Sequence, residues 1–159
     1  MAKEEEIQQA LVRQYPALEG HISIQRPRRM WIQVEASGFI DFLEYLVKEQ
    51  EVIMCCTITG LDKGETLAAI YHLARPDGII FNVEINVPKS NPVIQSITPT
   101  YPSADLYERE LIDLLGMKVE GLGEGFRYPL TDDWPKGQYP LRKDWKLDPA
   151  IEIGHLKEL

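Results

Sequence analysis

The chain has 159 residues, of which 44% are hydrophobic and 26% are charged, a size and balance typical of one compact soluble domain. Its formal net charge of −8 argues against a general nucleic-acid binder, because such a protein needs a basic surface to displace counterions from phosphates. No apolar run approaches the roughly 18 residues of a membrane span, and the acidic stretch from Met1 to Glu6 is unlike a signal peptide, so we expect a cytoplasmic protein that reaches a membrane only through a partner.

The first part of the chain predicts a helix, two short strands and a second helix. Residues 4–15 carry apolar side chains at helical spacing and end before a proline. Residues 21–25 and 30–34 are predicted strands, joined by a turn that contains a proline. An apolar stripe over residues 38–49 predicts the second helix, with Ser37 as its N-cap.

Three further strands are predicted to follow. Residues 52–58 are apolar almost throughout, which favours a central strand, and residues 66–74 form the next one. Residues 79–87 alternate between apolar and polar side chains, which is typical of a half-buried antiparallel strand. The order α-β-β-α-β-β-β therefore predicts an α+β fold, a mostly antiparallel sheet with helices on one face.

No cofactor or metal site is predicted from the sequence. Cys55 and Cys56 are the only cysteines, and two adjacent thiols cannot hold a tetrahedral zinc or an iron–sulfur cluster, so we interpret them as core residues. The histidines share no motif. The glycine string at 121–125 neither follows a strand nor opens a helix, so we interpret it as flexible backbone and not as a nucleotide-binding loop.

The segment 104–115 is predicted to form a helix that ends at Gly116, since glycine readily adopts the left-handed conformation after a helix C-terminus. At roughly 100° per residue, Asp105, Arg109 and Asp113 fall together at i, i+4 spacing, and we interpret them as an exposed ladder of ion pairs. The other half of the helix is predicted to be buried, and it holds Leu106, Tyr107, Leu111, Leu114 and Leu115.

Glu110 falls within this apolar half. A buried carboxylate needs a cation, a hydrogen-bond donor or a proton, because its desolvation alone is costly. Three interpretations remain open: a structural ion pair with Arg127 or with the segment 141–144, partial exposure at the edge of the helix face, or a proton-transferring acid. The last of these would suit a small acid–base enzyme that uses Glu110, Asp113 and Arg142.

From Met117 onward the helical and strand patterns disappear, and prolines, glycines and aromatic residues are frequent. A loop segment this long is uncommon inside a compact domain. We therefore predict an α+β domain over residues 1–120 and an extended arm over residues 121–159. Tryptophan, tyrosine and arginine are enriched at protein interfaces. The arm is accordingly expected either to dock on a partner or to pack its aromatic side chains on the chain's own sheet.

Three blocks of the second half resemble the signature of the complex I 30 kDa subunit family, whose pattern is roughly E-R-E-x-x-D-x-x-G, then D-W, then P-L-R-K-D. Here the blocks are YERELIDLLG at 107–116, Asp-Trp at 133–134 and PLRKD at 140–144. The signature positions that the resemblance implies as interface residues are Tyr107, Glu108, Arg109, Glu110, Asp113, Gly116, Trp134, Pro140, Leu141, Arg142, Lys143 and Asp144.

The resemblance implies a cofactor-free structural subunit with no catalytic centre of its own. Such a subunit packs against a large subunit related to the [NiFe]-hydrogenase catalytic subunit, near an iron–sulfur subunit, and its C-terminal segment lies along that partner. The chain lacks the histidines that complex I members usually carry near the second and third blocks. Its Asp-Trp-Pro and Tyr-Pro-Leu-Arg-Lys sequences look closer to the equivalent subunit of energy-converting [NiFe] hydrogenases than to that of NADH:quinone oxidoreductase. A stand-alone binding module remains the alternative.

Overall fold

The computed structural model describes residues 2–146, so the end of the predicted arm, residues 147–159, lies outside the described part of the chain. Within that part the helices are α1 (Lys3–Gln14), α2 (Phe39–Gln50) and α3 (Asp105–Leu115), with 3-10 turns at η1 (Pro16–Leu18), η2 (Ala36–Gly38) and η3 (Pro102–Ala104). The strands are β1 (Ile22–Arg26), β2 (Arg29–Gln33), β3 (Met54–Asp62), β4 (Thr66–Ala74), β5 (Ile80–Pro88), β6 (Val93–Gln95) and β7 (Lys118–Glu120).

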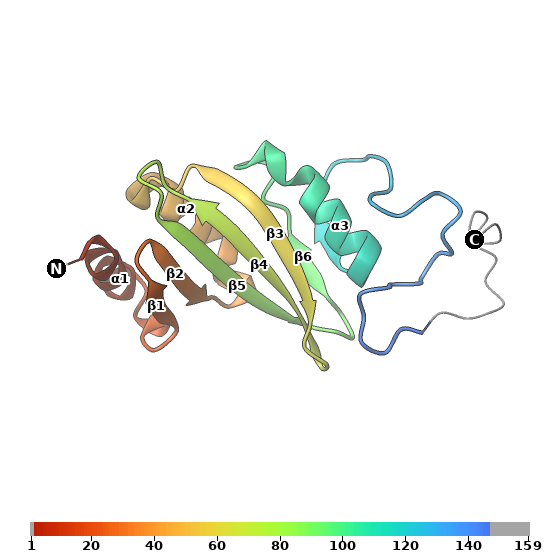
Figure 1. Ribbon diagram of the computed structural model, residues 1–159, viewed down its shortest axis with the longest axis horizontal. Helices are drawn as coiled ribbons and strands as arrows, with labels where there is room; N and C mark the ends of the chain where they lie inside the picture. Colours follow the sequence, from red (N-terminus) through yellow and green to blue (C-terminus); the bar gives the residue numbers. More distant parts are fainter. Residues whose placement is uncertain (1, 147–159) are drawn as a thin grey trace.

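Five strands form one sheet in the order β1-β2-β5-β4-β3, and β6 and β7 form a separate parallel pair. Every pairing in the large sheet is antiparallel except that of β2 with β5. The helices α2 and α3 both lie on one face of this sheet (Figure 1). The predicted α+β class, with a mostly antiparallel sheet and helices on one face, is therefore confirmed.

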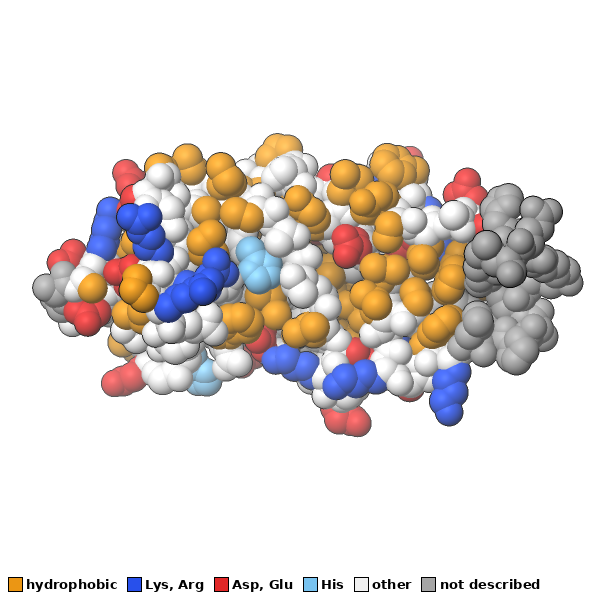
Figure 2. Space-filling view, viewed as in Figure 1, with side chains coloured by type: hydrophobic (Ala, Val, Ile, Leu, Met, Phe, Trp, Pro, Cys, Tyr) orange, Lys and Arg blue, Asp and Glu red, His pale blue; other side chains and the backbone are white. Residues whose placement is uncertain are grey.

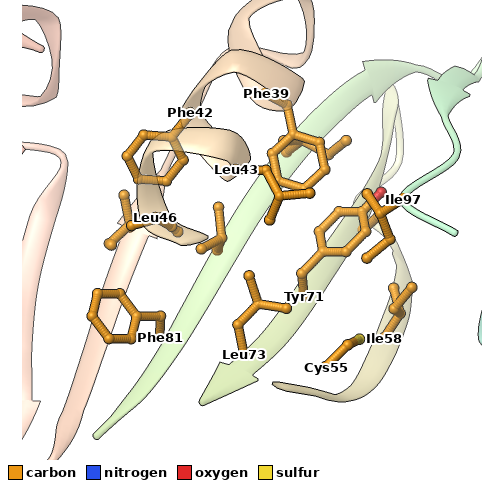
Figure 3. Close-up of a cluster of buried hydrophobic side chains, with 14 of the residues drawn as sticks. Phe39, Phe42, Leu43, Leu46, Cys55, Ile58, Tyr71, Leu73, Phe81 and Ile97 are labelled. Atoms are coloured by element: carbon orange, nitrogen blue, oxygen red, sulfur yellow. The ribbon is translucent and has the colours of Figure 1, made fainter. Parts of the chain in front are cut away.

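The core lies between α2 and the sheet. Phe39, Phe42 and Leu43 of α2 point toward Tyr71 and Phe81 of the sheet, and all of these side chains are buried (Figure 3). The rings of Phe39 and Tyr71 have their centroids 4.4 Å apart. All buried hydrophobic residues of the described chain lie before residue 120.

Several local predictions are wrong. The apolar segment predicted as a central strand begins β3, which is an edge strand of the sheet. Ser37 lies in η2 and does not cap α2, whose N-cap is Gly38. Cys55 is buried but Cys56 is exposed, because successive strand residues point to opposite faces. Burial raises the pKa of the Cys55 thiol to about 12.

The polar side of β5 is more enclosed than its alternation predicts. Asn82 is buried: its amide nitrogen donates to the carbonyl of Met30 at 3.0 Å, and its amide oxygen lies 2.7 Å from Nδ1 of His72. Glu84 is buried beneath an ion pair with Lys63. Partners on neighbouring strands and in the turn between β3 and β4 therefore bind the polar atoms of Asn82 and Glu84. Among residues 2–146, no helix is long and apolar enough to span a bilayer.

Candidate functional site

The helix α3 carries the first signature block and lies directly on β3. A Cβ atom added to Gly60 of β3 would lie 2.3 Å from Cδ1 of Leu115 and 2.6 Å from Cδ2 of Leu111. Only a glycine at this position allows the helix to approach the strand so closely. The helix is thereby fixed with Leu111 and Leu115 against the sheet, and its other side chains are directed elsewhere.

The fully buried carboxylate of α3 is Glu108, and not Glu110 as the helical wheel predicted. Glu108 is 0% exposed and accepts hydrogen bonds from the backbone N–H of Ile97 at 2.6 Å and from Oγ of Ser96 at 2.7 Å. Burial raises the pKa of this carboxyl group above its usual value, and the two hydrogen bonds oppose the rise only in part. Glu108 therefore holds the loop that follows β6 against α3.

Asp113 is the second buried acid, on the opposite side of α3, so the predicted exposed ladder is wrong at this position. Its carboxylate accepts a hydrogen bond from Nε of Arg127 at 2.6 Å and another from the backbone N–H of Leu130 at 2.7 Å. Arg127, predicted as a partner of Glu110, thus binds Asp113 instead. The arm covers this acid, which explains its burial on a face that does not touch the sheet.

Arg109 connects α3 to the glycine-rich start of the arm. Its guanidinium makes two hydrogen bonds of 2.9 Å to Asp105, which is the i, i+4 ion pair that the sequence predicts. It also donates to the carbonyl of Gly123 at 3.0 Å. A Cβ atom on Gly125 would lie 2.4 Å from this guanidinium, so a larger residue at that position would displace the arginine side chain. The glycine string, interpreted from the sequence as flexible backbone, thus contacts the signature arginine.

The third signature block binds the C-terminal end of α3. Arg142 donates from Nε to the carbonyl of Leu115 at 2.7 Å, and the backbone N–H of Leu141 donates to the carbonyl of Leu114 at 3.1 Å. These carbonyls have no partner within the helix, and the guanidinium charge suits the negative end of the helix dipole. The guanidinium carbon of Arg142 also lies 4.7 Å from the ring centroid of Tyr139.

A cluster of charged residues, Lys89, Asp62 and Asp144, holds the end of the third signature block to the sheet. Lys89 donates to Asp62 at 2.7 Å and to Asp144 at 2.8 Å, and the backbone N–H of Lys143 donates to Asp62 at 2.8 Å. Hydrogen bonding to Lys89 lowers the pKa of Asp62 to about 2. Sequence reasoning missed Asp62 and Lys89, because their partners lie 81 and 55 residues away and no local pattern marks them.

The middle of the arm is held by its own aromatic residues. Trp134 donates from Nε1 to the carbonyl of Gln138 at 2.9 Å, and Trp145 donates from Nε1 to the side chain of Gln138 at 2.8 Å. The two indole rings have their centroids 5.9 Å apart. Pro140 lies between Gln138 and Trp145 and directly precedes Leu141 and Arg142, which bind the end of α3. The described arm is thus ordered without forming a helix or strand of its own.

Glu110 is half-buried beside Leu114 and Leu141, which corresponds to the predicted interpretation of partial exposure. Asp113 and Arg142, the other members of the hypothetical acid–base trio, are each bound to separate partners in the arm and at the helix terminus. Tyr107 packs at the edge of the apolar core. Within the described residues no three His, Cys, Asp or Glu side chains gather as a metal site requires.

Gly116 is a position where a single added carbon is expected to disturb the arm. Its φ of +68° favours glycine, and a Cβ atom would lie 2.5 Å from the ring of Tyr139. We expect Gly116→Ala to lower the free energy of unfolding by about 1–2 kcal/mol and to increase tryptic cleavage after Arg142. Gly38→Ala is the matched control, because Gly38 has a negative φ and open space around its Cα. Equal effects of the two substitutions would contradict this role of Gly116.

The sequence is similar to known proteins along most of its length. The model of the family described as respiratory-chain NADH dehydrogenase, 30 kDa subunit, matches residues 32–150. The membrane-bound hydrogenase subunit beta of Pyrococcus furiosus is 24% identical, with 98% of this chain and 95% of that protein covered. Formate hydrogenlyase subunit 5 of Escherichia coli is 44% identical over 62 residues, which make up 39% of this chain but only 11% of that protein.

Among solved structures, a chain of the membrane-bound sulfane sulfur reductase, described as an archaeal respiratory membrane complex, has a TM-score of 0.81 and 28% sequence identity. The match covers 94% of this chain and 89% of that chain. The similarity therefore includes the arm as well as the sheet.

Proposed function

The chain belongs to the family of the 30 kDa subunit of respiratory-chain NADH dehydrogenase, and from this premise we propose that it is a structural subunit of a multi-subunit redox complex at a membrane. In this role it has no catalytic centre and no cofactor. It reaches the cytoplasmic face of the membrane through its partner subunits. Two relatives that match along most of their length are themselves parts of a membrane-bound hydrogenase and of a respiratory membrane complex.

The contacts of the signature residues support this proposal most directly. Arg109 donates to the carbonyl of Gly123, Asp113 accepts from the amide of Leu130, and Arg142 donates to the carbonyl of Leu115. The three side chains do not converge on a shared cavity. An enzyme site requires such groups to meet around a position that a substrate can occupy. Here they fix the arm on α3 in one conformation, which reduces the conformational entropy lost when the arm docks on another protein.

The partner that we propose is a large subunit related to the [NiFe]-hydrogenase catalytic subunit, with an iron–sulfur subunit nearby. The segment of formate hydrogenlyase subunit 5 that resembles this chain is a small part of a much longer polypeptide. Where a domain is joined covalently to a second unit in one protein, a separate copy of that domain is expected to bind the equivalent unit. We favour a hydrogenase-type complex over an NADH:quinone oxidoreductase as the parent.

Purification of the tagged full-length chain from its native cells tests this proposal. We expect a [NiFe]-type large subunit and membrane subunits to co-purify in equal amounts with it, as identified by mass spectrometry. A nickel content of about one atom per large subunit would assign a hydrogenase, and absence of nickel would assign a complex I-type parent. Recovery of the chain alone, as a monomer or homo-oligomer, would refute the subunit assignment.

A further inference from the structure

A groove lies between the outer edge of β3 and the helix α3. It encloses about 200 Å³, and its walls include Thr57 and Thr59 of the strand, Glu110 and Leu114 of the helix, and Leu141 of the arm. Hydrophobic side chains are spread along the sheet and over α3 on this side of the molecule, with acidic side chains between them (Figure 2). The groove is therefore largely apolar, with one carboxylate on its helix wall.

The strand wall of the groove is an unpaired sheet edge. Among the strands of residues 2–146, β3 pairs with β4 alone, and its other side has no strand beside it. Every second residue of such an edge turns its backbone N–H and C=O groups outward, where another chain can pair with them. Met54 and Leu61, at the two ends of the same strand, are 57% and 43% exposed. A nine-residue edge with exposed apolar side chains is a surface that other proteins usually cover.

The helix wall of the groove carries a charge that the described chain leaves unbalanced. Glu110 forms no ion pair with any described residue, whereas Asp105, Asp113 and Asp144 each have an arginine or lysine partner. The neighbours of Glu110 three and four positions away along α3 include no basic residue. A partner that buried this carboxylate without a cation would incur a large desolvation cost. An occupant that covers the groove must therefore supply hydrogen-bond donors to this carboxylate, and a basic side chain supplies both the donors and the opposite charge.

We propose that this groove receives an extended segment of the large partner subunit, which adds as a strand along β3 and places an arginine or lysine against Glu110. The open backbone edge favours an extended segment over a helix, because an added strand satisfies the outward N–H and C=O groups. Leu141, which is 53% exposed, and the half-buried Leu114 would then be covered by apolar side chains beside the cation. This inference rests on the proposed function, since it names the surface through which the partner is held.

Charge reversal at Glu110 is the first part of the test. Tagged wild-type, Glu110→Arg and Glu49→Arg chains are expressed in the native cells, and the co-purified large subunit is quantified by mass spectrometry. Glu49 is an exposed acid on α2, so Glu49→Arg makes the same charge change away from the groove. We expect Glu110→Arg to reduce the recovered large subunit by about tenfold or more, and Glu49→Arg to leave it unchanged. An unchanged melting temperature of Glu110→Arg excludes misfolding as the cause.

Hydrogen exchange of the backbone amides is the second part. The amides of residues 57–60 that point away from β4 are expected to exchange rapidly in the isolated full-length chain and slowly in the purified complex. β1, the other edge strand of the sheet, serves as the internal control and should change little. Protection of these amides already in the isolated chain would assign the groove to this chain's own residues 147–159 and would overturn the proposal.

The outcomes separate this inference from the proposed function. If the wild-type chain captures no large subunit, the proposed function itself fails. If wild type and Glu110→Arg capture equal amounts, or if residues 57–60 gain no protection in the complex, the subunit role stands and the groove is not the site of strand addition.

Discussion

Replacing Glu108 with alanine is expected to lower the free energy of unfolding of the isolated chain by about 3 kcal/mol. The substitution removes the acceptor for the Ile97 amide and the Ser96 hydroxyl, and both donors are buried with the carboxylate. It also leaves a cavity at a position that is fully enclosed. Chemical denaturation followed by circular dichroism measures the difference.

The matched control is Glu110→Ala, on the same helix and two residues away. Because Glu110 is half-buried and its side chain makes no hydrogen bond to another described residue, its replacement should change the free energy of unfolding by less than about 0.5 kcal/mol. A larger loss at Glu110 than at Glu108 would mean that the helix is rotated about its axis relative to the structure described.

The same side chain is expected to make stability depend on pH. The pKa of Glu108 is raised in the folded state, above the usual value of 4.5, because burial disfavours the charged form. Its contribution is therefore complete below the pKa of the unfolded chain and declines as the pH rises through the folded-state pKa. Relative to Glu108→Gln, the wild-type protein should lose stability as the pH rises above 4.5. A constant difference between the two proteins over this range would show that Glu108 does not titrate there.

Deleting residues 121–159 is expected to leave the α+β domain folded but to abolish co-purification of the large subunit. No described residue of the arm is buried, whereas the apolar core lies within residues 2–120. The truncated chain loses the partners of Asp113 and the cap of α3, so its free energy of unfolding should fall by about 2 kcal/mol without loss of cooperativity.

Arg142→Ala is the companion variant, because it keeps the whole arm and removes the bonds to the end of α3 together with the contact between the guanidinium and Tyr139. It is expected to assemble weakly and to be cleaved by trypsin within the arm faster than the wild type. Circular dichroism and native purification report the two properties separately. If the truncated chain is unfolded at 25 °C, the arm is part of the domain core and not chiefly a docking element.

Local periodicity was sufficient to predict most of the elements of the sheet. The strand predicted over residues 66–74 has the observed bounds of β4, and the second predicted helix differs from α2 by one residue at each end. β6 and β7 were missed because three residues are too few to show an alternation. The position of β3 at the edge was missed for a different reason: an apolar run indicates burial, but it does not indicate which strands lie on either side.

The orientation of α3 shows where sequence reasoning fails at the candidate site. A helical wheel assigns charged residues to solvent, so it placed Asp113 outside and made Glu110 the anomalous acid. In the structure the buried acids are Glu108 and Asp113, because donors from the loop after β6 and from the arm reach them. Leu106, which the helical wheel assigned to the buried half, is 42% exposed. Such donors lie 11 to 17 residues away and leave no mark in the helix itself.

The contacts between the arm and the end of α3 determine which part of the structure forms last during synthesis. The ribosome releases the sheet and α3 before the arm, and domains fold as their residues emerge. The carbonyls at the end of α3 are therefore hydrated until Arg142 has been synthesised, and the arm then binds to a surface that has already folded. A nascent chain halted before residue 140 would contain the folded domain without an arm bound to α3. A partner that recognises the bound arm would not bind such a chain.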